Sequence, residues 1–202
     1  MMKLWKNALV PAGKLFLICT LLCGVLYTVV ITGLAQVLFP HEAHGSIIVA
    51  SGKAYGSEYM GQPYTDPGHL WGRVMQVDVS TYKDVDGTPL LYAGPSNLSP
   101  ASASYNVLIA ERVARLRAAN PEQGTAAVPV DLVTGSGSGL DPGISPAAAA
   151  YQVPRIAKAR NMSEESVRQI IAQCTTGRFL GIAGEPTVQV LKVNLMLDGI
   201  LS

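Results

Sequence analysis

A glycine- and serine-rich stretch between Thr134 and Asp141 has the residue types that could bind an anion, because few bulky side chains cover its backbone N–H groups. A helix start lies downstream, as it does after phosphate-binding loops. A P-loop, however, ends in Gly-Lys followed by Ser or Thr, whereas this stretch continues with Leu140, Asp141 and Pro142. We therefore expect a structural turn or a contact with another protein here rather than a site that holds the phosphates of ATP.

Histidine offers little further chemistry, since the chain has only His41, His44 and His69. The first two could place two metal ligands close together, but no further histidine cluster completes a site, so we expect no metal. A Ser-His-Asp hydrolase would need His69 with Asp66 or Asp141 and an activated serine. The glycine-rich stretch only alternates glycine and serine over 135–139 and offers no persuasive Gly-x-Ser-x-Gly elbow between a strand and a helix. We expect no catalytic residues and no enzyme activity of the chain by itself.

Two clusters of charged residues could each bind a ligand or a partner, but each also has a simpler interpretation. Asp84 and Asp86 resemble the start of a calcium loop, but the distal glutamate is missing, so a solvated turn is expected. Arg155, Lys158 and Arg160 form a compact basic group that is either a solvated helix face or a docking patch for an acidic partner.

Composition narrows the class of protein. The chain has 202 residues, of which 49% are hydrophobic and 14% charged, and this excludes a disordered, solvated protein. Its formal net charge is +1, so no basic surplus is present for neutralising nucleic acid. The charge is unevenly placed, because residues 15–39 contain no charged residue at all.

The uncharged run 15–39 is long enough to span a membrane. As a helix it reaches about 37 Å, against a hydrocarbon core of about 30 Å. Lysines without any acid precede it, so the positive-inside rule places the N-terminus in the cytoplasm. The expected organisation is a cytoplasmic N-terminus (1–14), a transmembrane helix (15–39) and an extracytoplasmic domain (40–202).

A cleaved signal peptide is the alternative, because Gly33 and Ala35 have the spacing that a signal peptidase requires. The apolar run is much longer than an ordinary signal core and continues through 37–39, which favours a retained anchor. No small residues precede the cysteines of the run as lipoprotein processing would require.

Small residues recur every fourth position within the span. This spacing aligns them on one side of a helix, where another membrane helix can approach closely. Threonine and glycine are also simply common in membrane helices. No ionisable side chain lies in the span, which argues against ion conduction by this helix itself. The candidate contacts with a partner in the membrane are Thr20, Gly24, Thr28 and Thr32.

The remaining residues predict one mixed α/β domain, which makes the whole chain α+β. Only Cys174 lies in it, so the domain cannot contain an internal disulfide. Residues 61–106 are rich in turn formers and predict mainly loops with short strands. Elsewhere the patterns predict strands at 46–49, 54–55 and 128–132. They predict helices from 105 to a stop near Asn120-Pro121, over 146–160 (bent or interrupted at Pro154) and from 164 to the terminator Gly177. A strand over 187–197 has a bulge or a change to helix near Asn194.

A long motif then suggests a family. Residues 134–161 read TGSGSGLDPGISPAAAAYQVPRIAKARN. This resembles the signature of the KdpC family, which belongs to the Kdp potassium-transporting P-type ATPase and in which an SGLD stretch precedes an Ala-rich PRxAxAR segment. Further matches cover nearly the whole chain, including Gly72-Arg73 and Val193-Asn194-Leu195. Residues 76–91 depart from the sequence that is usual for the family.

The resemblance implies an accessory subunit of a high-affinity, ATP-driven potassium uptake complex in a bacterial plasma membrane. Its implied partners are a channel-like, potassium-selective protein, an ATP-hydrolysing P-type protein and a third, very small protein of the same complex. The family is described as a catalytic chaperone that raises the ATP affinity of the ATP-hydrolysing partner. The implied family-motif positions, in contact with nucleotide or with a partner, are Ser138, Gly139, Leu140, Asp141, Gln152 and Arg155.

The expected topology conflicts with direct contact between these residues and ATP, because ATP lies on the cytoplasmic side. We therefore expect the domain to pack over the outer face of the channel-like partner, with any effect on ATP affinity transmitted through membrane helices. No covalent cofactor is expected, and potassium is the ion that the complex transports. The alternative function is a free-standing, membrane-anchored binding or sensor domain.

Overall fold

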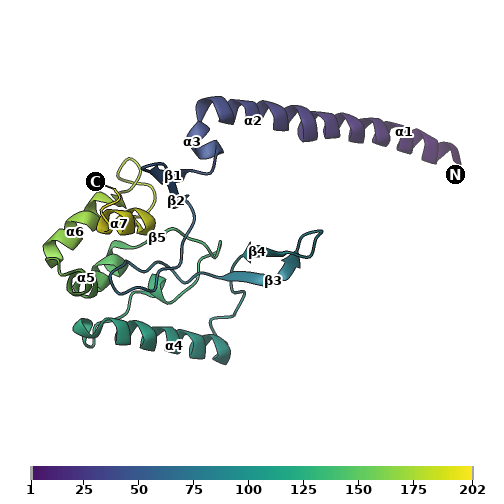
Figure 1. The fold of residues 1–202 in the computed structure, drawn as a ribbon. Helices are drawn as coiled ribbons and strands as arrows, with labels where there is room; N and C mark the ends of the chain where they lie inside the picture. Colours follow the sequence, from purple (N-terminus) through teal and green to yellow (C-terminus); the bar gives the residue numbers. More distant parts are fainter. Residues whose placement is uncertain (1, 202) are drawn as a thin grey trace. The chain divides into compact units, whose positions relative to one another are not determined.

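The computed structural model describes residues 2–201 (Figure 1). The chain forms two compact units that divide between Ile47 and Ile48. The first unit is helical, and the second, the C-terminal domain, combines helices with short strands. The predicted fold class, α+β with one long apolar helix at the N-terminus, is confirmed.

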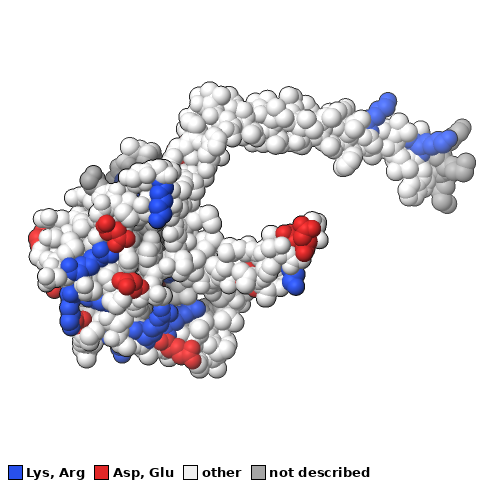
Figure 2. Space-filling view, viewed as in Figure 1, with Lys and Arg blue, Asp and Glu red and all other residues white. Residues whose placement is uncertain are grey.

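The N-terminal unit contains one helix, Trp5–Leu38, that is apolar and long enough to cross a membrane. Its 34 residues correspond to about 51 Å, well above a hydrocarbon core of about 30 Å. Figure 2 shows this helix white over most of its length, with basic side chains only toward its N-terminal end. The helical elements of this unit are α1 (Met2–Cys19), a π-helical stretch (Thr20–Leu26), α2 (Tyr27–Leu38) and the short α3 (Pro40–Ala43).

Two hairpins form the first part of the C-terminal domain. Strands β1 (Ile47–Ala50) and β2 (Lys53–Ser57) confirm the predicted strand, turn and strand, and both turn residues, Ser51 and Gly52, have positive φ. Strands β3 (Val77–Lys83) and β4 (Pro89–Ala93) pair antiparallel and form a ribbon with mostly exposed side chains. This second hairpin includes most of residues 76–91, whose sequence departs from the usual pattern of the family that the chain resembles.

Three of the helices begin at serine caps that the sequence displays. Ser102, Ser145 and Ser163 each accept a hydrogen bond from the backbone N–H three residues later, which satisfies a donor at the helix start. The helices of the C-terminal domain are α4 (Ala103–Ala119), α5 (Pro146–Arg160), α6 (Glu164–Gln173) and α7 (Val190–Leu197).

A small antiparallel sheet and the helices enclose the core. Strand β7 (Thr187–Gln189) lies between β5 (Gly143–Ile144) and β6 (Thr175–Thr176). The buried side chains come largely from α5, α6, β7 and α7, and the most deeply buried apolar ones include Leu70, Val153, Ile156, Val167, Val188 and Val193.

Three local predictions are wrong in their details. Residues 128–132 do not form a strand, because Val130–Leu132 is a 3-10 turn in which Asp131 accepts a hydrogen bond from Ser145 N–H at 2.7 Å. Of the two alternatives at Pro154, interruption is wrong, since α5 continues through it and its neighbours' core contacts keep the helix intact although proline removes one backbone donor. Helix α6 ends at Gln173, ahead of the expected terminator Gly177, because β6 pairs with β7 from Thr175 onward.

The C-terminal segment follows one of the two predicted alternatives. The shift in apolar phase marks a change from strand to helix, which confirms the second alternative. The change occurs at Val190, however, because Val190, Leu191 and Val193 all enter the core from helical spacing.

Candidate functional site

The motif loop, residues 134–141, is a closed turn whose own side chains bond its N–H groups. Ser136 Oγ accepts a hydrogen bond from Gly139 N–H at 3.0 Å. Ser138 Oγ accepts one from Leu140 N–H at 3.2 Å. Because both donors are already bonded within the loop, they do not point freely toward an anion.

The same loop supports other parts of the chain through its backbone. Leu140 O accepts a hydrogen bond from Gly61 N–H at 2.7 Å, and Gly139 O accepts one from Gln76 N–H at 3.0 Å. Gly139 has φ +72°, and a Cβ there would stand 2.7 Å from Gly94 O and 2.8 Å from Gln76 O. The close approach of three backbone segments therefore requires glycine at this position.

Asp141 forms the charged contact of the loop. Arg73 Nη1 donates to Asp141 Oδ2 at 3.0 Å, and Arg73 Nη2 donates to Gly135 O at 3.3 Å. A parallel backbone bridge between Val74 and Gly135 runs beside them. The motif loop thus holds the second half of a stretch that we call the Trp71 segment, residues 66–76.

Gln152 holds the first half of the Trp71 segment. Its side chain is fully buried, and its amide forms two hydrogen bonds of 2.9 Å with the backbone N–H and C=O of Trp71. The same amide donates to Ala148 O at 3.2 Å and accepts from Arg155 Nη2 at 2.6 Å. Both polar atoms of Gln152 are therefore used inside the fold.

Arg155 extends this contact. Its side chain is 5% exposed, with Nε donating to Asn120 Oδ1 at 3.1 Å and Nη1 donating to Pro67 O at 2.5 Å. The guanidinium carbon lies 4.4 Å from the centre of the Trp71 ring, a cation–π contact. Burial lowers the pKa of Arg155 to about 10, which leaves the group positively charged at neutral pH.

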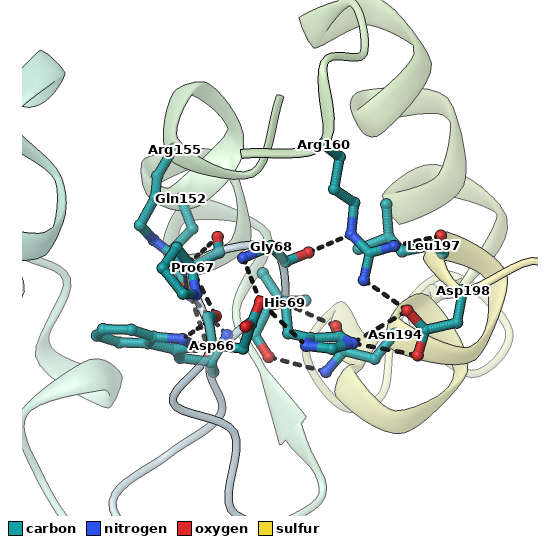
Figure 3. Close-up of polar contacts among 12 residues, drawn as sticks. Asp66, Pro67, Gly68, His69, Gln152, Arg155, Arg160, Asn194, Leu197 and Asp198 are labelled. Atoms are coloured by element: carbon teal, nitrogen blue, oxygen red, sulfur yellow. Dashed lines mark hydrogen bonds and ion pairs between the residues drawn. The ribbon is translucent and has the colours of Figure 1, made fainter. Parts of the chain in front are cut away.

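Figure 3 shows how the end of α5 and the end of α7 hold the same segment. Arg160 donates to Leu197 O and to Asp198 Oδ1, both at 2.5 Å, and also to Gly68 O. His69 Nε2 lies 3.1 Å from both carboxylate oxygens of Asp198. The Asp198 carboxylate thus orients the ring of His69 within a structural network.

The basic group predicted on α5 is not a single solvated face or docking patch. Arg155 and Arg160 turn inward, because backbone carbonyl groups of the Trp71 segment accept their hydrogen bonds. Lys158 alone is well exposed, and it pairs with Glu122 at 2.8 Å. Arg155 and Lys158 are three residues apart and share a side of α5, so the contacts of each side chain, rather than helical spacing, separate the exposed lysine from the buried arginine.

Asp198 gives this network a pH dependence. Burial by itself would raise the pKa of its carboxyl, but hydrogen bonds and charge attraction from Arg160 and His69 outweigh burial, and its pKa lies below the ordinary value. A carboxyl with a lowered folded-state pKa stabilises the fold above its unfolded pKa of about 3.9. That stability is lost as the pH falls through the folded-state pKa.

We therefore expect Asp198→Asn to lower stability at neutral pH and to flatten the stability profile below about pH 4. Denaturant midpoints of the detergent-purified chain between neutral and acidic pH measure this. Asp86→Asn, in the exposed turn of the β3–β4 hairpin, is the control and should follow the wild-type profile. An unchanged profile for Asp198→Asn would contradict the role of this carboxylate.

Asn194 and Trp71 complete the network, and neither is among the site residues predicted from the sequence. Asn194 is 1% exposed and forms hydrogen bonds of 2.7 and 3.0 Å with the backbone of Leu70. The available signal was an asparagine between apolar residues in the mostly apolar segment 190–197, because a buried amide needs partners. The partner itself lies 124 residues away and has no local signature.

The candidate residues of the membrane helix belong to the other unit and stand apart from this network in the sequence. A Cβ added to Gly24 would meet only Thr20 Cγ2, at 4.0 Å, so these two positions share a side of the helix. The Thr28 hydroxyl donates to Cys23 O at 3.4 Å, five residues earlier, within the π-helical stretch. Thr32 follows one turn later in α2.

Comparison with known proteins identifies the family. A family model described as "KdpC: K+-transporting ATPase, c chain" matches residues 9–199. The chain belongs to the KdpC family. A potassium-transporting ATPase KdpC subunit of Clostridium perfringens is 60% identical over 185 residues, covering 92% of this chain and 93% of the relative. One from Clostridium botulinum (strain Eklund 17B) is 54% identical over 200 residues, covering 99% and 100%.

The KdpC match includes both units of the structure. It begins within the apolar helix and ends after α7, so neither the helix nor the domain is an addition to the family's length. A more distant KdpC protein, from Polaromonas naphthalenivorans, is 49% identical and covers 96% of each chain. Within this KdpC chain, residues 2–201 contain no group of three His, Cys, Asp or Glu side chains placed to hold a metal ion.

Proposed function

We propose that this chain is a non-catalytic accessory subunit of an ATP-driven potassium uptake complex in a bacterial plasma membrane. The observation that carries the proposal is the KdpC match over nearly the full length, with relatives named as potassium-transporting ATPase subunits. The single apolar helix supports it, because its span 15–39 has no charged side chain and one such helix provides no ion pathway of its own. The chain must then act on other proteins of the complex.

The proposed partners are the channel-like, potassium-selective protein, the ATP-hydrolysing P-type protein and the very small third protein of the complex. The proposed orientation has a cytoplasmic N-terminus and an extracytoplasmic C-terminal domain, on the strength of the lysines before the span. In this orientation the domain lies on the side from which potassium enters. It would stabilise the outer part of the complex and influence ion entry.

Any effect on the ATP affinity of the ATP-hydrolysing partner then acts at a distance. The buried positions of Gln152 and Arg155 support this, because their polar atoms are bonded to the protein's own backbone and side chains. We propose that these family-motif residues shape the Trp71 segment. A change in ATP affinity would be a coupling free energy carried through contacts between the proteins rather than through direct nucleotide contact.

Affinity purification from potassium-starved cells tests the assignment. A tagged full-length chain in mild detergent should recover a multispan channel-like protein and a P-type ATPase, identified by mass spectrometry. Recovery of the chain alone, with both proteins verified in the same membranes, would contradict the proposed function.

Gly24→Leu tests the contact within the membrane. The bulky side chain would keep a partner helix from approaching closely, so recovery of the other proteins of the complex should fall several-fold. Gly33→Leu is the matched control, since Gly33 lies in the same helix but not on the side that carries the small residues at every fourth position. This variant should recover the complex normally. Equal recovery with both variants would show that this side of the helix is not a contact.

A further inference from the structure

A cleft with a cavity volume of about 230 Å³ opens beside Trp71 in the C-terminal domain. One wall is the stretch around Trp71 and Arg73, and the other is helix α4 with Arg112 and Arg115. Among the described residues that line the cleft, none is acidic. The volume far exceeds the ~10–15 Å³ that a single water requires, so a side chain can enter.

The three arginines of this cleft are incompletely neutralised. Arg73 pairs with Asp141, but its Nε is buried and has no hydrogen-bond partner. Arg112 donates to Val133 O at 2.8 Å, which is a neutral acceptor. Among the described residues, the three guanidinium groups therefore share a single carboxylate, and one buried N–H of Arg73 remains unbonded.

Arg115 is the exposed member of the three. Its guanidinium carbon lies 5.5 Å from the centre of the Trp71 ring, and among residues 5–201 no carboxylate forms an ion pair with it. In Figure 2, basic side chains lie over the region of α4, with an acidic group beside them. A concave wall of one charge concentrates the field and attracts groups of the opposite charge.

We propose that this cleft receives an acidic side chain, Asp or Glu, from an exposed segment of another protein of the complex. Planar guanidinium groups match the geometry of a carboxylate, and arginine, tryptophan and tyrosine are enriched where protein interfaces gain most of their binding energy. The apolar parts of Tyr64 and Leu116 supply contacts for the chain that carries the acid. The inference rests on the proposed function, because it needs a partner within the complex.

Zero-length cross-linking tests for a partner carboxylate directly. Arg115→Lys places an amine at the cleft, and a carbodiimide couples an amine to a carboxylate only when the two are in contact. In the detergent-purified complex we expect a cross-link between this position and an Asp- or Glu-containing peptide of another protein. The expected yield is at least tenfold above that of Arg117→Lys, an exposed position on the same helix that does not line the cleft.

The chain carries its own reference for the reaction. Lys192 and Glu58 lie 2.6 Å apart and should cross-link in every sample. If this reference forms in an intact complex while Arg115→Lys yields no link to another protein, the inference is overturned. A link only to carboxylates of the same chain also overturns it. A wild-type chain that recovers no other protein of the complex would instead refute the proposed function.

Charge reversal provides the second readout. Arg115→Glu should lower recovery of the complex about tenfold at moderate salt, whereas Arg117→Glu should leave it unchanged. Because the Arg115 side chain is exposed, the fold should survive, and an unchanged melting temperature verifies this. Normal recovery with folded Arg115→Glu would count against the cleft as a docking site. A second outcome would also count against it: phosphate raises the melting temperature, Arg115→Glu abolishes this rise, and no cross-link to another protein forms. The cleft would then bind a small anion.

Discussion

Gly139→Ala is expected to destabilise the C-terminal domain by about 2 to 4 kcal/mol. A residue with a side chain is strained at φ +72°, and its Cβ would stand only 2.7 to 2.8 Å from backbone atoms of Gln76 and Gly94. Backbone atoms cannot move aside as the end of a flexible side chain can. The motif loop would therefore have to separate from the segments that it supports.

Chemical denaturation of the detergent-purified full-length chain, followed by circular dichroism, measures this change. Gly137→Ala is the matched control in the same loop, because its Cβ would meet no atom within 4 Å. Its stability should remain within about 0.5 kcal/mol of wild type. Similar stability for both variants would mean that the close packing of three backbone segments at Gly139 does not stabilise the domain.

The second large effect is expected for Gln152→Leu, which should lower the free energy of unfolding by about 3 kcal/mol. Leucine is similar in size but cannot bond the N–H and C=O of Trp71. It also removes an acceptor from the buried Arg155. Each buried polar group left without a partner costs about 1 to 3 kcal/mol.

The same denaturation experiment checks Gln152→Leu, and Gln169→Leu is its control. Gln169 is exposed on α6 and bonds only Glu165 at 3.4 Å, so its replacement should change stability little. A Gln152→Leu chain of normal stability, within a complex of altered ATP dependence, would refute the structural role. It would favour a direct role of the amide in binding a ligand.

Both predictions rest on one structural role of the family motif, which is to hold the Trp71 segment in place. Asp141 and Gly139 hold the Trp71 segment at residues 73–76, while Gln152 and Arg155 hold it at residues 66–71. This segment in turn forms one wall of the arginine-lined cleft. Changes in the motif should therefore alter the proposed docking surface even though Gly139 and Gln152 do not line it.

The sequence by itself determined the features that depend on neighbouring residues. The apolar helix follows from a run without charge, and the helix starts at Ser145 and Ser163 follow from capping residues next to the N–H groups that they bond. The family, too, was readable from the continuous motif at residues 134–161. In each case the residues that make the prediction are close in the sequence to the feature that they predict.

Only the tertiary structure decided what the polar residues of the motif contact. Gln152 and Trp71 are 81 residues apart, and Leu70 and Asn194 are 124 residues apart. Local spacing also wrongly predicted a strand over residues 128–132, where Val130–Leu132 is a 3-10 turn and Asp131 accepts a hydrogen bond from the N–H of Ser145. Hydrogen bonds of buried groups must be satisfied, but the partner is selected by packing of the whole domain, which no local pattern encodes.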